Sequence, residues 1–340
     1  MTTIMDLSII IPVYNGAATI GRCLDSIYSQ GLDEQHFEVI CVDDCSPDPS
    51  SVAAIKNYKF QGGHPSNLIL IKHETNKRQG GARNTGIRAA KGEWIEFVDC
   101  DDYLMSDTLK KVMLAVESNQ GLEMVIFDHI EGTDNHIINK DFMKANRSQV
   151  MTGADFFISQ ISPTGPTVSL FKRKCFYSDN LWFVENHFFE DGDFVLKYLL
   201  YAKKVLYIPI DVYFYVRYIG QTTDIGNNIK KITDLFLLYH RIAKIGIEFK
   251  DNNKRITNLL LGTANAARVV YMKKYMWKIP FRERLSLLRE LSIPYKQANL
   301  FKDFTINHPL VTCLLLSFLN QPILDALVKI KKIIKVSTFS

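Results

Sequence analysis

The sequence predicts an α/β protein in which a mostly parallel sheet, flanked by helices, is followed by a helical C-terminal region. Short apolar runs alternate with segments of helical periodicity up to about residue 225. Polar turns follow these runs, as is typical of strands joined through crossover helices. Beyond about residue 227 the patterns are helical and strand signals are few. A chain of 340 residues can hold two regions, because single cores stop growing at about 250–300 residues.

The N-terminal part is expected to hold four buried strands, each an apolar, β-branched run that ends at a polar turn. These strands are predicted at residues 7–13, 37–42, 67–72 and 94–98. Helical periodicity predicts intervening helices at residues 17–30, 50–60 and 82–90. Strand–helix alternation of this kind places the carboxyl ends of the strands along one edge of the sheet, where ligands bind.

The next part is expected to extend the sheet with shorter strands. Strands are predicted at residues 124–127, 168–172, 204–210 and 213–217, and helices at residues 106–118, at 152–161 and from about 194. Ser106 or Asp107 is the expected cap of the first of these helices. Residues 131–150 are polar and lack periodicity, so we expect an irregular insertion or a lid there.

The C-terminal region is expected to begin near residue 225, which gives a first domain at 1–225 and a second at 226–340. Helices are predicted in the second at residues 229–249, 254–275, 281–291 and 310–336. The last of these is apolar with several lysines, and an amphipathic basic helix can bind the inner face of a membrane. Alternatively, it packs on the first domain or in an oligomer contact.

Composition favours a globular, cytoplasmic protein. Hydrophobic residues make up 47% of the chain and charged residues 23%, which argues against disorder. The net charge of +5 is too small to indicate a nucleic-acid surface, so no nucleic-acid partner is expected. The six cysteines lack the spacing of a zinc site, and we expect them to be reduced. No signal peptide and no membrane-spanning segment is expected.

Acidic or polar residues follow three of the predicted strands, at Tyr14–Asn15, Asp43–Asp44 and Asp99–Asp102. Because these strand ends share one edge of the sheet, the side chains are expected to meet in a single crevice. Three carboxylates within residues 99–102 repel one another unless a cation lies among them. Oxygen ligands suit Mg²⁺ or Mn²⁺, so a metal site is one interpretation. The alternative is a solvated acidic turn that caps the next helix.

Five segments in order resemble a known family. They are Ser-Ile-Ile-Ile-Pro-Val-Tyr-Asn at 8–15, Val-Asp-Asp-Cys-Ser at 42–46, Asn76 with Gly-Ala-Arg-Asn-Thr-Gly at 81–86, Phe-Val-Asp-Cys-Asp-Asp at 97–102, and Glu190–Asp191. Over about residues 5–220 the chain resembles a family 2 glycosyltransferase of the bacterial surface-glycan type. The resemblance implies a GT-A fold with a Rossmann-like sheet. Its nucleotide-sugar half would be about 1–105 and its acceptor half about 106–225.

The resemblance also implies donor-binding residues and a metal ligand. Asp101 would bind Mn²⁺ or Mg²⁺, and Asp99 would contact the ribose or a metal-bound water. The donor-binding set would be Pro12, Tyr14, Asn15, Asp44, Asn76, Arg83 and Asp99. Asp44 would accept a hydrogen bond from a uracil ring, and Asp43 could equally be the structural one of the pair. Tyr14 would lie against the base or ribose, or pack in the core. Arg83 would contact phosphate, or form a surface salt bridge.

On the acceptor side, Asp191 is the candidate general base, because an inverting transfer needs a carboxylate opposite the leaving group. Asp193 competes for that role, and an acid at this position can equally cap a helix. Glu190, Asp102 and Arg217 are secondary candidates: Asp102 would contact the acceptor or cap the following helix, and Arg217 resembles the Arg of the family's aromatic-Arg segment.

The expected function is an inverting, metal-dependent transfer of a sugar from a nucleoside-diphosphate donor, most simply a UDP-sugar. The acceptor would be a hydroxyl of a glycan or of a lipid-linked oligosaccharide in cell-surface polysaccharide synthesis. Two alternatives remain at this point. One is a nucleotidyltransferase that makes the nucleotide-sugar, and the other is a catalytically inactive scaffold of the glycan machinery.

Overall fold

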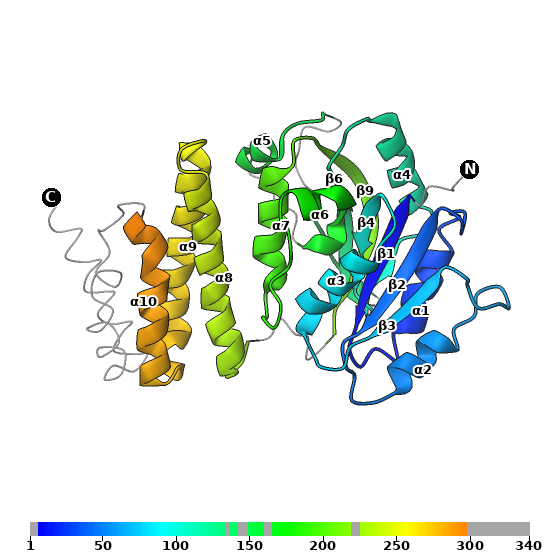
Figure 1. Ribbon diagram of the computed structural model, residues 1–340, viewed down its shortest axis with the longest axis horizontal. Coiled ribbons are helices and arrows are strands. Elements are labelled where there is room, and N and C mark those ends of the chain that lie inside the picture. The colour runs from blue at the N-terminus through cyan, green and yellow to red at the C-terminus, as the bar shows by residue number, and fades with distance from the viewer. Residues whose placement is uncertain (1–5, 134–135, 142–148, 160–164, 219–224, 298–340) are drawn as a thin grey trace, which may run out of the picture. The chain divides into compact units, whose positions relative to one another are not determined.

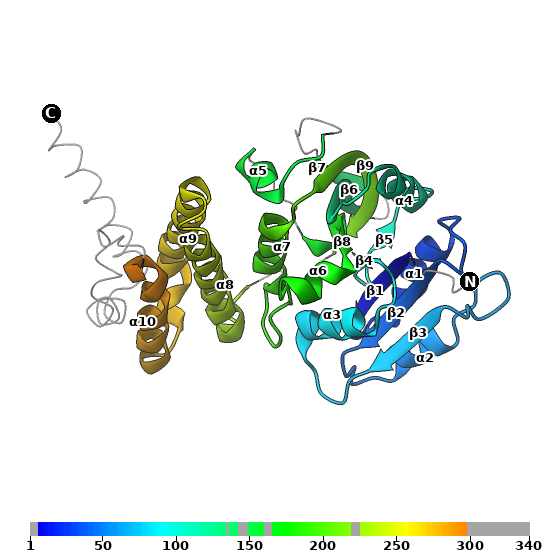
Figure 2. The ribbon, with the colours of Figure 1, turned by 45° about the horizontal axis from the view of Figure 1, so that its top comes forward.

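The computed structural model describes residues 6–133, 136–141, 149–159, 165–218 and 225–297. The chain forms two compact units, residues 1–221 and 222–340. In its described residues, the first unit is built on a nine-stranded sheet in the order β3-β2-β1-β4-β8-β6-β9-β5, with β7 paired to β6. Figures 1 and 2 show this sheet with helices on both of its faces.

The N-terminal half of the sheet is parallel, as the sequence predicts. Its strands are β1 (Leu7–Val13), β2 (Phe37–Asp43), β3 (Leu68–Lys72) and β4 (Trp94–Phe97). The helices between them are α1 (Ile20–Tyr28), α2 (Ser50–Lys56) and α3 (Arg78–Ala89). β1 pairs with β2 on one side and β4 on the other, and β2 pairs with β3. The loops after β1, β2 and β4 therefore open at one edge.

The second half of the sheet is mixed. Its strands are β5 (Tyr103–Leu104), β6 (Met124–Thr133), β7 (His136–Asp141), β8 (Ser169–Lys172) and β9 (Val205–Val216). The helices are α4 (Leu109–Ser118), α5 (Gly153–Ile158), α6 (Arg173–Ser178) and α7 (Glu190–Tyr201), with a 3-10 turn at Pro166–Val168. β8 is antiparallel to both β4 and β6, whereas β6 and β9 are parallel.

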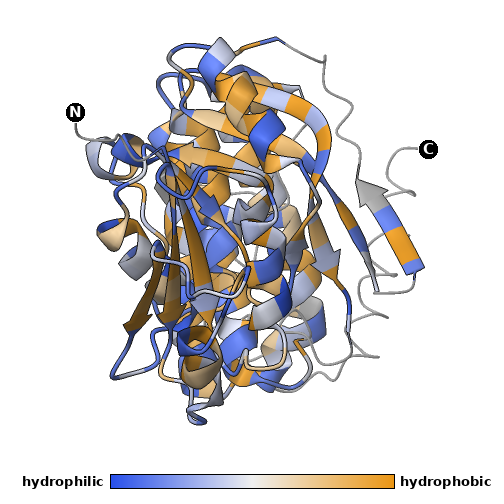
Figure 3. Cartoon of the chain, turned by 90° about the vertical axis from the view of Figure 1, so that its right-hand side faces the viewer, coloured by the Kyte–Doolittle hydropathy of each residue, from blue (hydrophilic) through white to orange (hydrophobic). Residues whose placement is uncertain are grey.

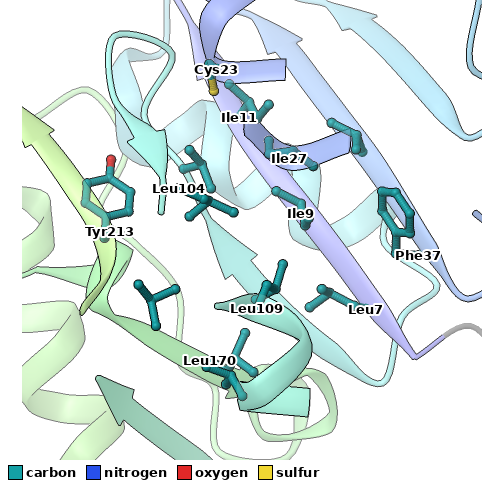
Figure 4. Close-up of a cluster of buried hydrophobic side chains, with 14 of the residues drawn as sticks. Leu7, Ile9, Ile11, Cys23, Ile27, Phe37, Leu104, Leu109, Leu170 and Tyr213 are labelled. Atoms are coloured by element: carbon teal, nitrogen blue, oxygen red, sulfur yellow. The ribbon is translucent and has the colours of Figure 1, made fainter. Parts of the chain in front are cut away.

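Two apolar cores lie on opposite faces of the sheet, because side chains alternate along each strand. One core packs β1 residues such as Ile9 and Ile11 against α1 and α4. Figure 4 shows this cluster, with Cys23 and Ile27 of α1 beside the strands. The other core packs Ile10 and Phe97 against α3, α6 and α7. The central strands are accordingly mostly apolar (Figure 3).

Three local predictions were wrong. Residues 131–133 and 136–141 are not irregular, because β6 and β7 form an antiparallel hairpin there. β9 is one strand, not two, since Pro209 is accommodated where its register against β6 shifts. Helix α4 begins at Leu109 after Thr108, and Gln30 Oε1 accepts the N–H groups of both residues, so neither Ser106 nor Asp107 caps it.

The second unit consists, in its described part, of helices α8 (Ile229–Glu248), α9 (Lys254–Tyr275) and α10 (Phe281–Gln297), with a 3-10 turn at Met276–Lys278. Asn228 and Asn253 cap α8 and α9 through their side-chain oxygens. Gly246 of α8 lies against Leu260 and Leu261 of α9. Within the described residues, no helix is long and apolar enough to cross a membrane. The predicted basic helix at 310–336 lies outside them.

Glu96 of β4 is fully buried, and neither of its carboxylate oxygens has a hydrogen-bond partner. Burial raises the pKa of Glu96 well above its usual value, because the buried site disfavours the charged carboxylate. The unfolded chain releases the proton above a pH of about 4.5. The contribution of Glu96 to stability is therefore full below that pH, and it is lost as the pH rises toward the folded-state pKa.

We expect Glu96→Gln to remove this loss. Urea unfolding at pH 5 and pH 8 should show that the free energy of unfolding of the variant, relative to the natural protein, increases with pH by up to about 1.4 kcal/mol per unit. Equal pH dependence in the two proteins would show that the pKa of Glu96 is the same in the folded and unfolded states.

Candidate active site

The loop after β4 carries the three carboxylates of Asp99, Asp101 and Asp102 to the open edge of the sheet. Asp99 is held from helix α3: its Oδ1 accepts hydrogen bonds from Gln79 Nε2 (3.0 Å) and from Arg83 Nη2 (2.8 Å). Because two donors converge on one oxygen, the orientation of the Asp99 carboxylate is fixed by the fold.

Arg83 lies buried between the carboxylates of Asp99 and Glu190, which are far apart in the chain. Its Nη1 is 2.8 Å from Glu190 Oε1, and its Nη2 is 2.8 Å from Asp99 Oδ1. The residue is only 2% exposed, and its guanidinium lies 5.3 Å from the ring centre of Phe183. Burial lowers the pKa of Arg83, but Asp99 and Glu190 outweigh this effect and raise it. The surface salt bridge considered from the sequence is therefore a buried double ion pair.

Helix α3 approaches the segment before α7 closely enough for this bridge to form. Asn84 donates from Nδ2 to the main-chain oxygen of Phe183 (2.9 Å) and accepts the N–H of the same residue at Oδ1 (3.0 Å). A Cβ at Gly80 would lie 2.5 Å from the main-chain oxygen of Val184. The glycine is thus needed for this close contact between α3 and Val184.

Glu190 and Asp191 lie in the first turn of α7, where carboxylates interact favourably with the helix dipole. Neither caps the helix: the N-cap is Phe189, which adopts a left-handed conformation with φ of 58°. Glu190 is buried, and burial raises its pKa to about 7 against the opposing effect of Arg83. Asp191 is half-buried, whereas Asp193 is buried. Asp191 is thus the more accessible of the two base candidates.

Asp101 and Asp102 contact the end of β9. Tyr218 donates its hydroxyl hydrogen to Asp101 Oδ2 (2.6 Å). Asp102 is 1% exposed and accepts hydrogen bonds from the Tyr213 hydroxyl (2.6 Å) and the Val216 N–H (2.8 Å). Burial, with the charges of Asp99 and Asp101, raises the pKa of Asp102 to about 8. These contacts show that Asp102 ties the loop to the sheet and does not cap α4.

The loops after β1 and β2 line the same edge. Tyr14 is 52% exposed, and the N–H of Asn15 donates to Ser46 Oγ (3.0 Å). Asp44 is buried: His73 Nδ1 lies 2.7 Å from its Oδ1, which also accepts the N–H of Lys77 (2.8 Å). The predicted uracil-binding carboxylate therefore already has protein partners on one of its oxygens.

The remaining candidates are placed by the neighbouring strands. Asn76 Nδ2 donates to the main-chain oxygen of Asp44 (3.0 Å), which fixes the loop between β3 and α3. Pro12 is buried in β1 beside Val42. Arg217 forms an ion pair with Glu131 of β6, and its guanidinium lies 4.7 Å from the ring centre of Tyr215.

Sequence reasoning missed Gln79, Tyr213 and Tyr218 as partners of the acidic loop. Gln79 was missed because the helix was predicted to begin at residue 82, whereas α3 already begins at Arg78. Tyr213 lies in β9 and Tyr218 follows two residues after the end of that strand, which reaches the loop because β9 pairs with β5. An aromatic strand in the sequence signals burial, but it does not reveal which carboxylate its hydroxyl groups will meet.

The loop between β4 and β5, residues 98–102, is called the Asp99 loop below. Its carboxylates have the chemistry of a site for a hard divalent cation. Burial and the negative charge of Asp99 raise the pKa of Asp101. The two carboxylates repel each other, and a bound cation would neutralise their charges. Within the described part of the chain, no group of three His, Cys, Asp or Glu side chains could hold a metal ion by itself. Mg²⁺-type ions commonly bind one or two carboxylates together with substrate phosphates, so two carboxylates are sufficient.

Comparison with known proteins identifies the family. The profile described as "Glycosyl transferase family 2" matches residues 8–183, which is more than half of the chain and includes every strand up to β8. The chain belongs to glycosyl transferase family 2. The matched region contains Asp44 in the loop after β2, the Asp99 loop and all of α3, and it ends just before Glu190.

Individual relatives agree with this assignment. A poly(ribitol-phosphate) beta-glucosyltransferase of Bacillus spizizenii is 33% identical over 220 residues, which are 64% of this chain and 33% of that protein. The chain thus spans about a third of the length of such relatives.

Two solved structures show the same fold. The crystal structure of S. aureus TarS 1–349 with UDP-GlcNAc has a TM-score of 0.66 at 21% identity, over 86% of this chain and 81% of that one. The mannosyltransferase PcManGT of Pyrobaculum calidifontis, in complex with GDP-Man and Mn²⁺, has a TM-score of 0.50 at 16% identity, over 92% and 81%. The predicted GT-A fold is confirmed.

The close contact at Gly80 can be tested with a matched pair of glycines. We expect Gly80→Ala to force α3 away from Val184, which should lower the free energy of unfolding by roughly 1–3 kcal/mol. Gly21→Ala is the control, because a Cβ there meets nothing within 4 Å and alanine favours helix α1. Urea unfolding of both variants is the measurement. Equal stability of the two variants would contradict the close contact.

Proposed function

We propose that the protein is an inverting glycosyltransferase that moves a sugar from a nucleoside-diphosphate donor to a hydroxyl group. The observation that carries this proposal is the pairing of Arg83 with both Asp99 and Glu190. It brings a loop suited to a charged leaving group next to a helix start suited to a general base. Both are needed in a single displacement at the anomeric carbon.

On the donor side, the edge formed by Tyr14, Asn15, Asp44 and Asn76 would hold the nucleoside, with Asp99 near the ribose. Pro12 would shape the floor of this site from β1. Uridine is the proposed base, because TarS, which has the same fold, was solved with UDP-GlcNAc and with UDP. A hexosyl or N-acetylhexosaminyl group is the proposed sugar.

Asp101 would hold a divalent cation, Mn²⁺ or Mg²⁺, with Asp99 close to it. When bound, such an ion neutralises the negative charge that develops on the departing diphosphate. The mannosyltransferase of the same fold was solved with Mn²⁺. In this chain, Arg22 Nη2 and Tyr218 hold the two ends of Asp101, at its main-chain oxygen (2.8 Å) and at Oδ2.

On the acceptor side, Asp191 would take the proton of the attacking hydroxyl. The acceptor oxygen forms a bond to the anomeric carbon while the bond from that carbon to the phosphate oxygen breaks. The electron pair leaves with the diphosphate, and the proton stays on the Asp191 carboxyl. Attack opposite the leaving group inverts the anomeric centre.

The proposed acceptor is a hydroxyl-rich bacterial surface polymer or its lipid-linked precursor. This follows from the relative of Bacillus spizizenii, which is named for transfer to poly(ribitol-phosphate). Asp102 is buried and accepts hydrogen bonds from Tyr213 and Val216, so we do not propose that it contacts the acceptor. Its proposed role is to hold the Asp99 loop.

Asp191→Asn and Asp101→Ala should each lower sugar transfer by at least about 10²-fold, because they remove the base and the leaving-group ligand. The assay screens nucleotide-sugars with Mn²⁺ and follows both donor hydrolysis and transfer. Asp33→Asn, an exposed carboxylate in the turn before β2, is the control and should retain activity.

Three outcomes would count against the proposal. Full activity of Asp191→Asn or Asp101→Ala would remove that residue from its role. Release of pyrophosphate from UTP and a sugar phosphate would indicate a nucleotidyltransferase instead. Calorimetry that detects no binding of UDP in the presence of Mn²⁺ would indicate an inactive scaffold.

A further inference from the structure

We propose that Arg83 is a positioning residue, which holds the donor carboxylate Asp99 and the base-bearing start of helix α7 at a fixed separation. This inference rests on the proposed function and separates the positioning role of Arg83 from the donor role of Asp99 and the base role of Asp191. Arg83 touches neither donor nor acceptor, and it acts on the donor side through Asp99 and on the acceptor side through Glu190.

The burial of Arg83 separates this role from direct binding of the donor. The residue is 2% exposed, and each terminal nitrogen is already 2.8 Å from a carboxylate oxygen. Its Nε is also enclosed, and it has no hydrogen-bond partner in the described structure. A guanidinium that left these carboxylates for a phosphate would leave Glu190 as an uncompensated buried charge.

The Arg83–Glu190 ion pair also affects Asp191, because Glu190 and Asp191 are the first two residues of helix α7. Successive residues of a helix point in directions roughly 100° apart. Glu190 is turned toward Arg83, so Asp191, the next residue of the helix, points in a different direction and is half-buried. Because α7 begins at Glu190, the Arg83–Glu190 ion pair fixes the rotation of the first turn and therefore the direction of the Asp191 carboxylate.

Hydrogen bonds on both sides of Arg83 hold α3 and the residue before it against the segment that precedes α7. Asn84, the next residue of α3, is bonded to both main-chain polar groups of Phe183, and the Lys77 main-chain oxygen accepts the N–H of Asn186 (3.1 Å). A guanidinium also presents its N–H groups in a fixed planar fork. Lysine offers a single point charge at this site, so it cannot hold Asp99 and Glu190 in the same geometry.

The two ends of the bridge can be tested separately. Glu190→Gln removes the charge on the acceptor side only, and Gln79→Ala removes a second hydrogen bond to Asp99 on the donor side only. Arg88→Gln is the matched control, because this arginine lies on the same helix but is 55% exposed and pairs with Glu185 at the surface. For each variant, the measurements are the Kd of UDP with Mn²⁺ and the kcat and KM of transfer.

We expect Glu190→Gln to lower kcat by ~10²-fold, the effect of a misplaced reacting group, with the Kd of UDP within about threefold of the natural protein. Gln79→Ala should instead raise the Kd of UDP or the KM of the donor, with a smaller change in kcat. Arg83→Lys should show both effects, and Arg88→Gln neither. The melting temperature of each variant is also measured, because it identifies variants that have lost folded structure. A loss of folded protein does not by itself separate a change in kcat from a change in the Kd of UDP.

Two results would overturn the inference while leaving the proposed function intact. One is a Glu190→Gln variant with unchanged kcat in an enzyme that transfers sugar. The other is an Arg83→Lys variant in which only the Kd of UDP rises, since this would make Arg83 a donor ligand. If the natural protein transfers no sugar from any nucleotide-sugar, the proposed function and this inference both fall.

Discussion

Arg83 lies buried between Asp99 and Glu190, and the arrangement of the candidate site depends on these two ion pairs. Taking three charges out of water is costly, so such a cluster adds little to stability compared with apolar residues of the same volume. Removing one partner, however, leaves an uncompensated charge and costs about 3–5 kcal/mol. The bridge is thus better understood as a device that fixes geometry than as a source of stability.

The rest of the first unit provides the frame for this bridge. Parallel strands bring the loops after β1, β2 and β4 to one edge, and the antiparallel strand β8 joins them to the half that carries α7. The glycine at position 80 and the side chain of Asn84 then bring α3 against the segment before α7. At the other side of the loop, Asp102 binds the end of β9. The Asp99 loop is therefore held from two directions.

The sequence predicted the strands of the parallel half and the acidic strand ends well, because alternating apolar runs and polar turns are local signals. It also identified Arg83, Glu190 and Asp99 as site candidates through their resemblance to a family. It did not predict that these three residues contact one another. That contact joins distant parts of the chain through close packing at Gly80, and no local pattern encodes it.

Other errors have the same origin. The β6–β7 hairpin was missed because its polar residues pair across strands at an edge of the sheet, where no apolar alternation is required. The roles of Tyr213 and Tyr218 depend on where β9 ends relative to the Asp99 loop. Such positions follow from sheet order and register, which become evident only when the whole fold is known.

The most direct test of the account is a crystal structure of the protein with UDP and Mn²⁺. We predict that the diphosphate lies next to Asp101, with Arg83 still within hydrogen-bond distance of both Asp99 and Glu190. A guanidinium that has turned onto the diphosphate, with Glu190 released, would contradict the account.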